Sequence, residues 1–251
     1  MRYDRLGAME QFIREQGTAT LEELAQRFRV SLNTIRRDVA ELVRRGSVVK
    51  VYGGVSVAEG QLLPISVRSE KMNEAKQRIG KLSADFVKDN STIFLDAGST
   101  PVCILPHLST KKNITIVTYS LAALIEASKY PDLQVIALGG LFSPATFSYV
   151  GSTPLEALRR MRIDTVFIAA SAVSTERGLM NNTYLEAEIK RYVVRDNENI
   201  ILMTDHTKFG QSAVYSFADL SDITMLVTDC EPEKKFQEEL IRRKIKIVFP
   251  Q

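Results

Sequence analysis

The sequence predicts a mixed α/β protein, in which a small N-terminal helical part with a β-hairpin precedes a larger α/β domain. Two runs of helical periodicity occupy residues 20–45, and a Gly-Gly pair between apolar residues follows them. Beyond residue 90, short apolar β-rich runs alternate with helical stretches. Such alternation is typical of a largely parallel sheet that helices cover on both faces. The 251 residues are enough for two domains.

The helical periodicity begins at Thr20, which can cap a helix, and Glu23 stands three residues later, as in a reciprocal capping box. The apolar stripe of this helix consists of Leu21, Leu24, Ala25 and Phe28. After a tight connection, Ser31 can cap a second helix that runs to about Arg45 and stops at Gly46. Two helices with so short a turn indicate a helix-turn-helix, whose second helix enters the major groove of DNA.

The second helix divides into two faces when its residues are placed about 100° apart. The face directed toward a core consists of Leu32, Ile35, Val39 and Leu42. The opposite face carries Asn33, Thr34, Arg37 and Arg44. Arginine suits guanine and asparagine suits adenine, so we predict base contacts from Asn33, Thr34 and Arg37. Arg36, between the two faces, and Arg44 are predicted to bind phosphates.

A β-hairpin follows in the segment SVVKVYGGVSV, where two apolar strands flank Gly53 and Gly54. Beside a helix-turn-helix such a hairpin forms a wing, and Lys50 and Tyr52 are placed to contact the DNA backbone. The alternative is a helical pair with solvated arginines that contacts another protein. Caps, turn, arginine face and hairpin occur together and in order, which favours DNA binding. The predicted DNA contacts are Thr20, Ser31, Asn33, Thr34, Arg36, Arg37, Arg44, Lys50 and Tyr52.

The excess positive charge lies in this N-terminal part. Residues 1–58 carry ten Lys and Arg against seven Asp and Glu, whereas the remainder carries 23 of each. Asp38 would repel DNA, so we expect it to orient a neighbouring arginine. A net charge of +3 is modest, so tight binding of double-stranded DNA requires two copies on one site, and we expect a homo-oligomer.

The composition also bears on compartment and cofactors. No apolar run approaches the roughly 20 residues of a membrane span, and the first residues are polar, unlike a signal peptide, so we expect a cytoplasmic protein. Cys103 and Cys230 are isolated, which favours structural thiols over a disulfide, a metal site or a redox switch. The two histidines, His107 and His206, offer no zinc-ligand spacing, so we expect no metal and no cofactor.

The boundary between the two parts lies near residues 58–68, where regular periodicity is lost. We therefore place the DNA-binding domain at 1–58, a linker at 59–73 and the second domain at 74–251. Residues 69–89 predict one long amphipathic helix, whose apolar face consists of Met72, Ile79, Leu82 and Phe86. This helix either leads into the second domain or mediates a dimer, and the sequence leaves both open.

The second domain is predicted to contain seven strands and at least four helices. The strands are STIFLD, ITIVT, LQVIAL, DTVFIAA, NIILMT, ITMLVT and IKIVF. The helices are 119–129, 153–161, 184–196 and 232–243. Ligands of such sheets bind at the carboxyl ends of the strands, so the loops that follow the strands are candidates for a site.

Several of these loops suit an anion. After the first strand, Asp96 and Gly98 form a turn, and Ser99, Thr100 and the amides of a following helix can bind the anion. Comparable residues follow three other strands: Thr118 and Ser120, Gly139 and Gly140, and Asp205 and Lys208. Turn and cap chemistry explains each loop alone. Their recurrence at one edge of the sheet favours a small anionic ligand over a scaffold without a ligand.

Five segments together resemble the deoxyribose-repressor (DeoR) family of bacterial transcription factors. SLNTIRRDVAELVRRGSVVKVYGG resembles its DNA-binding signature, and FLDAGST, IVTYSLAAL, ALGG and TDHTKFG resemble its sensor domain in the same order. The resemblance covers nearly the whole chain. It implies a winged helix-turn-helix regulator, usually a repressor, whose sensor domain resembles ribose-5-phosphate isomerase and responds to phosphorylated sugars. GLMNNTYLEAEIK and DHTKFG resemble, more weakly, the family's repressors of inositol catabolism, so an inositol-derived phosphate is one option.

In that resemblance, 96–100 corresponds to the phosphate-binding loop of the isomerases, and Lys208 contacts a phosphate or hydroxyl. The residues implied to bind the effector are Asp96, Gly98, Ser99, Thr100, Thr118, Ser120, Gly139, Gly140, Ser171, Glu188, Asp205 and Lys208. The chain departs from the isomerases, because 169–172 reads Ala-Ala-Ser-Ala in place of paired aspartates and 178–188 holds no lysine. Isomerisation requires a positioned base for proton transfer, and Glu188 alone is weak support for such a base. Binding without turnover is therefore predicted, with an isomerase carrying an accessory DNA-binding domain as the alternative.

Overall fold

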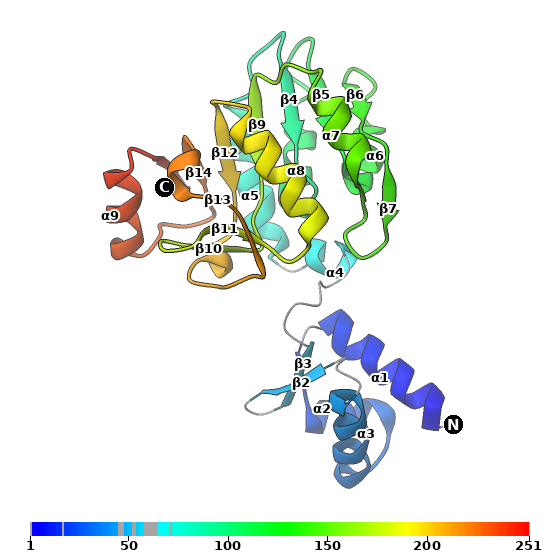
Figure 1. Cartoon of the computed structure of the whole chain (residues 1–251). Coiled ribbons are helices and arrows are strands. Elements are labelled where there is room, and N and C mark those ends of the chain that lie inside the picture. Colours follow the sequence, from blue (N-terminus) through cyan, green and yellow to red (C-terminus); the bar gives the residue numbers. More distant parts are fainter. Residues whose placement is uncertain are drawn as a thin grey trace. The chain divides into compact units, whose positions relative to one another are not determined.

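The computed structural model describes residues 2–16, 18–44, 48–51, 54–57, 65–70 and 72–250 (Figure 1). The chain divides into two compact units, Met1–Arg68 and Ser69–Gln251. The predictions on Tyr52, on the Gly46 stop, on Gly53 and on the linker positions 59–64 lie outside the described residues.

The N-terminal unit combines three helices with a three-stranded antiparallel sheet of order β1-β3-β2. Its elements are α1 Arg2–Gln16, β1 Thr18–Thr20, α2 Leu21–Phe28, α3 Leu32–Arg44, β2 Val48–Val51 and β3 Gly54–Val57. The predicted capping box is present, since the Glu23 amide donates to Thr20 Oγ1 at 3.1 Å and the Thr20 amide donates to Glu23 Oε2 at 2.8 Å. The helix pair and the hairpin are confirmed, whereas α1 and β1 were not predicted.

One core holds this unit together. Its buried residues are Leu6, Met9, Ile13, Ala19, Leu24, Ile35, Val39, Leu42, Val48 and Val55. The predicted inner face of α3 is thus correct except at Leu32, which is 36% exposed because it begins the helix, before the turn that packs on the core. Gly54 lies opposite Thr20 in the sheet, and a Cβ there would come within 2.2 Å of the Ala19 carbonyl oxygen. Only glycine allows β1 and β3 to approach so closely.

The second unit is built on a seven-stranded parallel sheet of order β15-β14-β12-β9-β4-β5-β6. Its strands are β4 Thr92–Leu95, β5 Thr115–Thr118, β6 Gln134–Ala137, β9 Thr165–Ile168, β12 Ile200–Met203, β14 Met225–Val227 and β15 Lys246–Val248. All seven predicted strands are present. Their alternating side chains fill two cores, one on each face, as expected for a doubly covered sheet.

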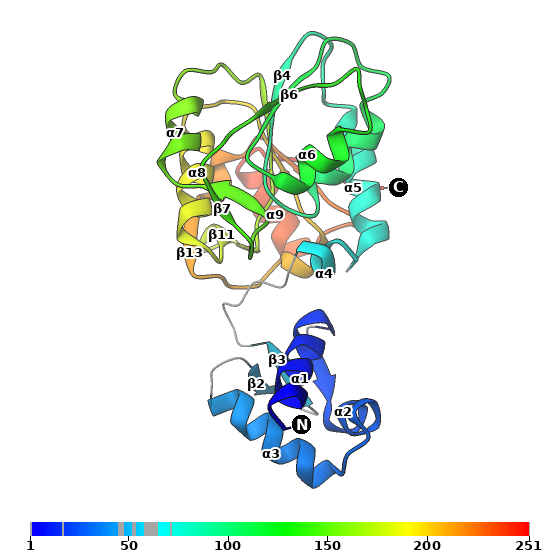
Figure 2. The ribbon, with the colours of Figure 1, turned by 90° about the vertical axis from the view of Figure 1, so that its right-hand side faces the viewer.

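Helices cover both faces of the sheet (Figure 2). They are α5 Asn73–Ala84, the 3-10 helix Pro101–His107 and α6 Leu121–Ala127 on one face, and α7 Ser152–Leu158, α8 Tyr184–Arg195 and α9 Lys234–Arg242 on the other. The last four predicted helices are confirmed as α6 to α9. In the described part of the chain, no helix is both long and apolar enough to cross a membrane.

Five short antiparallel strands were not predicted. β7 Leu141–Ser143 and β8 Ser148–Val150 form a hairpin after β6, and β10 Ala172–Ser174, β11 Gly178–Asn181 and β13 Tyr215–Ala218 form a small second sheet. They are as short as the parallel strands, but each contains a serine, glycine or asparagine and so lacks the continuous apolar run that marks those strands. They bring polar side chains to the edge of the large sheet where the parallel strands end.

The single helix predicted over 69–89 is wrong. α4 Ile65–Glu70 is separated from α5 by Met72, whose φ of 56° is left-handed, and α5 ends at Ala84. The apolar spacing is real, since Ile79 is fully buried, but Met72 is 37% exposed. Periodicity reports a buried face and does not detect one left-handed residue, a conformation that methionine by itself disfavours.

Candidate DNA-binding surface and effector site

The start of α3 exposes the side chains that were predicted to read DNA. Asn33, Arg36 and Arg37 are exposed and Thr34 is half-buried. Ser31 caps the helix, because its Oγ accepts from the Thr34 amide at 3.3 Å and lies 3.0 Å from the Thr34 hydroxyl. A capped helix start with exposed donors is the geometry with which recognition helices meet base edges.

The arginines on this surface differ in what they contact. Arg36 donates to Asn33 Oδ1 across 3.4 Å, and Arg44 forms a two-point ion pair with Glu41 at 2.7 and 3.0 Å. Arg37 has no such partner among the described residues. Exposed pairs of this kind contribute only about 0–1 kcal/mol, so phosphate can displace Glu41 from Arg44. Lys50 on β2 is exposed, beside the predicted groove-facing surface.

Asp38 orients an arginine, as expected, although the partner comes from a helix that was not predicted. Its carboxylate is buried in α3 and accepts from Arg5 Nε of α1 at 2.8 Å. The pair fastens α1 to α3 and compensates the negative charge of a carboxylate on the buried side of α3. Thr20, a predicted DNA contact, caps α2, because its side-chain oxygen accepts from the Glu23 amide.

The loops predicted to bind an effector follow the neighbouring strands β12, β9, β4, β5 and β6, so the topology places them at one edge of the sheet. Asp96, after β4, is fully buried there. Its Oδ1 accepts from the Tyr119 hydroxyl at 2.6 Å, and its Oδ2 accepts from the Ala169 amide at 2.8 Å and from Lys190 Nζ at 2.5 Å. Both oxygens therefore hold β4, β5, β9 and α8 together.

Lys190, which was not among the predicted site residues, is the buried cation that pairs with Asp96. It is 2% exposed and donates to Asp96 and, at 2.9 Å, to the Ala169 carbonyl. Its ammonium also lies 5.4 Å from the Phe217 ring centroid. A lysine among the apolar positions of helix 184–196 is the signal in the sequence that could have identified it.

The hydroxyl of Tyr119 stays a hydrogen-bond donor to Asp96, because burial and the charge of Asp96 raise the pKa of Tyr119 well above its ordinary value.

A second buried carboxylate, Glu186, lies one turn before Lys190 on the same face of α8. Its Oε2 accepts from Asn181 Nδ2 at 3.0 Å and from Thr183 Oγ1 at 2.7 Å. Ser171 joins this network through Asn181 Oδ1 at 3.1 Å. The predicted residue, Glu188, is half-buried and pairs with Arg191 outside this network, so its effector contact stays a prediction.

The phosphate-type loop at 96–100 leads into a 3-10 helix, where an ordinary helix was expected. Gly98 and Thr100 are buried, Ser99 is half-buried, and the Ser99 carbonyl accepts from Cys103 Sγ at 3.3 Å. Ser99 is thus the hydroxyl of this loop with the most access to solvent.

The hydroxyls after β5 serve the backbone. Thr118 Oγ1 donates to the Leu95 carbonyl at 2.6 Å and accepts from the Ser120 amide at 3.1 Å. Ser120 Oγ accepts from the Ala123 amide at 3.2 Å and caps α6. These are the turn and cap roles that the sequence could not distinguish from ligand binding.

The remaining predicted residues divide into exposed and buried ones. Gly139 and Gly140 are exposed, and Gly140 needs its φ of 135°. Asp205 is buried, and its Oδ1 accepts from the Thr207 amide at 3.1 Å. Lys208 is half-buried and, within the residues that the structure describes, forms no ion pair. Among the residues described, no carboxylate therefore neutralises its charge.

Two family models match the chain, one for each part. The model of the DeoR C terminal sensor domain matches residues 71–230, and that of the DeoR-like helix-turn-helix domain matches residues 5–61. A solved D-ribose-5-phosphate isomerase in complex with phospho-erythronic acid is 18% identical, with a TM-score of 0.41 over 55% of this chain and 54% of that one. A likeness at that level carries no argument about activity.

Curated relatives match over almost their full length. HTH-type transcriptional regulator IolR of Bacillus subtilis (strain 168) is 34% identical over 91% of this chain and 91% of its own. The glycerol-3-phosphate regulon repressor of Escherichia coli (strain K12) is 27% identical over 94% of each. HTH-type transcriptional repressor GlcR of Bacillus subtilis (strain 168) is 26% identical over 98% of this chain and 95% of its own. The chain belongs to the DeoR family and is a DNA-binding transcriptional regulator.

Proposed function

We propose that the protein represses a sugar or polyol catabolic operon and leaves its operator when a phosphorylated sugar or polyol binds the second unit. The observation that carries the DNA-binding half is the capped start of α3, with Asn33, Arg36 and Arg37 exposed together. The names of the relatives, among them a glycerol-3-phosphate regulon repressor, support the metabolic half.

Base reading falls to Asn33, Thr34 and Arg37 in this proposal, because they lie at the start of α3. Arg36, Arg44 and Lys50 bind phosphates on either side. Amide and guanidinium groups can each make two hydrogen bonds to one base, whereas phosphate contacts position the protein without reading sequence.

The effector is proposed to bind at the strand-end loops, where hydrogen-bond donors are available to a ligand. Ser99, the amides of 98–100 and Lys208 meet the phosphate, and the exposed loop at Gly139 and Gly140 borders the sugar. Asp96, with Lys190 behind it, sets the position of the phosphate loop without touching the ligand. An inositol-derived phosphate is one option within this class.

Release from DNA requires that the effector bind the DNA-free arrangement more tightly than the DNA-bound one. The coupling equals that difference in affinity, and is typically about 1–3 kcal/mol. Binding without turnover suffices for this role. The ionisable groups Asp96, Glu186 and Lys190 at the strand ends are all buried and hydrogen-bonded within the protein, which disfavours the isomerase alternative.

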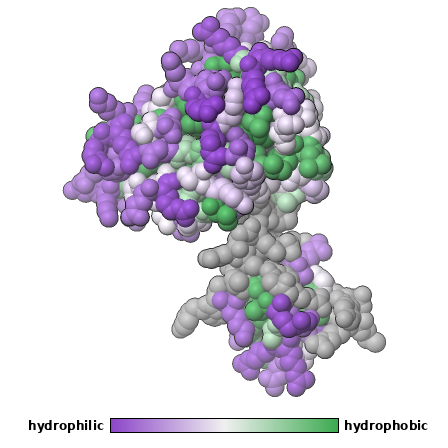
Figure 3. Space-filling model, in the orientation of Figure 1, coloured by the Kyte–Doolittle hydropathy of each residue, from purple (hydrophilic) through white to green (hydrophobic). Residues whose placement is uncertain are grey.

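We also propose that the protein acts as a homo-oligomer, so that two recognition helices meet two half-sites. Hydrophobic side chains gather on the right-hand side of the larger unit in Figure 3, where Figure 1 places β7. Leu141 and Phe142 of β7 are 69% and 38% exposed. A second copy is the proposed occupant of this surface, since β6, next to the hairpin, is an edge strand with Ile136 39% exposed.

The deciding experiment is a titration of DNA from upstream of the protein's own gene, with and without a panel of sugar and polyol phosphates. The matched controls are the same sugars without phosphate and a scrambled DNA of equal length. Release by one phosphorylated compound, and not by its unphosphorylated form, is the expected result. Tight binding that no phosphate alters would reject the proposed effector class, and equal binding to scrambled DNA would reject operator recognition.

A further inference from the structure

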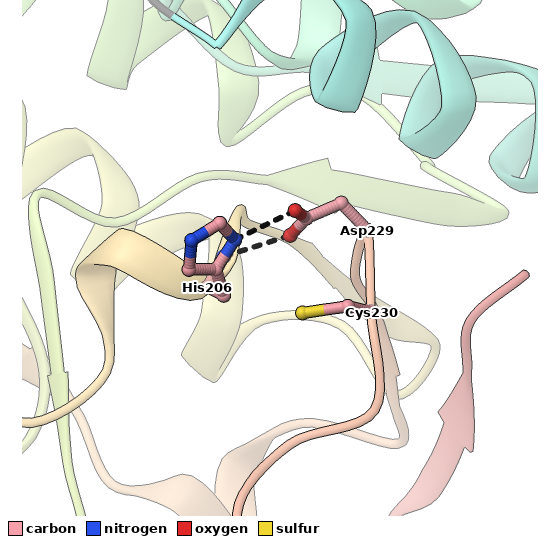
Figure 4. A group of neighbouring side chains, drawn as sticks. All are labelled: His206, Asp229 and Cys230. Carbon is pink, nitrogen blue, oxygen red and sulfur yellow. Dashed lines mark hydrogen bonds and ion pairs between the residues drawn. The ribbon is translucent and has the colours of Figure 1, made fainter.

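Three side chains with metal-binding atoms, none of which has a role in the proposed function, meet beside the loop that carries Lys208. His206 follows β12, and Asp229 and Cys230 follow β14, the parallel neighbour of β12. The pairing of Met203 with Val227 brings the two loops side by side, although His206 and Asp229 are 23 positions apart. Their potential ligand atoms all lie within 4.8 Å of one another (Figure 4).

The geometry of the group is held before any ion binds. Asp229 Oδ1 accepts from the His206 amide at 2.8 Å, and Asp229 Oδ2 lies 2.7 Å from His206 Nδ1. The Asp229 side chain is 4% exposed and that of His206 is 48% exposed. Cys230 is an exposed free thiol whose sulfur points toward the imidazole in Figure 4.

The surroundings admit and favour a cation. His206 and Cys230 line a pocket of about 770 Å³. Four glutamates line it against two basic residues, and these six are Glu231, Glu233, Glu238, Glu239, Lys235 and Arg242. The negative balance attracts a positive ion, and the open side leaves room for a water ligand.

We propose that His206, Asp229 and Cys230 form a zinc-binding site at the carboxyl ends of β12 and β14. An imidazole nitrogen, a carboxylate oxygen and a thiolate are the donors that zinc takes in proteins. In tetrahedral zinc these atoms lie about 3.3–3.6 Å apart. On binding, the His206–Asp229 pair therefore opens from its present 2.7 Å, and any wider pair closes from at most 4.8 Å. The thiol proton is released to solvent when the Zn–S bond forms, and water supplies the fourth ligand.

The same residue types also build nucleophilic triads, in which the thiol is hydrogen-bonded to the imidazole that activates it. Among the described residues, no hydrogen bond joins Cys230 to His206, whose Nδ1 instead lies 2.7 Å from Asp229. The arrangement therefore fits a set of metal ligands better than a nucleophilic pair.

The test uses the full chain, stripped of metal and kept under a reductant that contains no thiol. Zinc is titrated against a chromophoric chelator, and cobalt(II) is added separately as a spectroscopic substitute. The wild type is expected to bind one zinc per chain and to show a thiolate-to-cobalt charge-transfer band. Cys230→Ser should lose the band and more than about 10-fold in zinc affinity, the least that even partners outside the coordination sphere contribute.

The chain supplies matched controls, because it has two cysteines and two histidines. Cys103→Ser should keep the cobalt band and the zinc affinity, and His107→Asn should behave like the wild type while His206→Asn loses affinity. Thermal unfolding without metal verifies that each variant is folded. If His206→Asn does not fold, the zinc affinity of Cys230→Ser decides the test. Absence of stoichiometric zinc binding in the wild type, or full retention by Cys230→Ser, overturns the proposal.

Discussion

Arg37 lies on the exposed face of α3 and is committed to no other side chain in the described structure. We predict that Arg37→Ala weakens operator binding by about 1–3 kcal/mol, because a guanidinium that reads a base carries that much discrimination. Fluorescence anisotropy with operator and random DNA measures it. Arg160→Ala, an exposed arginine of the second unit, serves as the control and should change neither. Equal losses on both DNAs would make Arg37 a phosphate contact.

Lys208 can be separated from DNA binding in the same assay. For Lys208→Ala we expect normal operator affinity without effector and a higher effector concentration for half-release, because one charge-assisted contact to phosphate is lost. Lys112→Ala removes an exposed lysine that precedes β5, at the opposite end of the strands, and its curve should overlay that of the wild type. An unchanged midpoint for Lys208→Ala would exclude this contact.

The roles of single polar residues were the least predictable part of the site. Asp96, Thr118 and Ser120 were correctly placed at the strand ends, but the side-chain oxygen atoms of each form hydrogen bonds within the protein. A sequence shows that a carboxylate follows a strand, and does not show which donors reach it. Lys190 escaped notice because its partner lies 94 residues away, a distance that local patterns do not report.

At the scale of elements, the close approach of β1 and β3 can be tested by substituting Gly54, with Gly7 as the control position. Gly54→Ala places a Cβ 2.2 Å from the Ala19 carbonyl, so the strand pair must separate and the N-terminal unit should lose stability. Gly7→Ala, in the middle of α1, meets nothing within 4 Å and should stabilise by about 0.5–1 kcal/mol, since alanine favours the helix. Thermal unfolding of both variants measures this, and a neutral Gly54→Ala would show that the hairpin adapts freely.

Helices with a clear apolar stripe and strands with a continuous apolar run were predictable, and strands without such a run were not. The seven parallel strands and α6 to α9 have apolar runs or stripes long enough to be read from the sequence. β7 and β10 are as short as β14 and β15, but each ends in a serine that interrupts its apolar run, and their pairing depends on neighbours supplied by the fold. The break at Met72 depends on backbone geometry that the apolar spacing does not encode.

At the scale of the whole molecule, the exposed hairpin predicts how copies associate. Leu141→Glu places a charge on the proposed contact, so sedimentation should show a smaller oligomer and weaker operator binding. Ile241→Glu changes a side chain of similar exposure, 65%, on α9 and should leave the assembly intact. If Leu141→Glu sediments like the wild type, β7 does not form the interface.

Linkage predicts a second property of the whole molecule. If the effector lowers operator affinity by some factor, between about 5- and 150-fold, operator must lower effector affinity by the same factor. Calorimetric titration of effector into free protein and into the operator complex measures it. Equal affinities in the two titrations would mean that the effector does not drive release.

The buried pair of Asp96 and Lys190 also bears on how the chain folds during synthesis. Asp96 leaves the ribosome long before Lys190, and until α8 emerges its carboxylate has no buried counter-charge. An uncompensated buried charge is strongly unfavourable, so the strand edge cannot close before most of the second unit has been made. The N-terminal unit, complete by residue 68, has no such requirement. The nascent chain therefore acquires its DNA-binding unit first and its sensor last, as domains generally fold in order of synthesis.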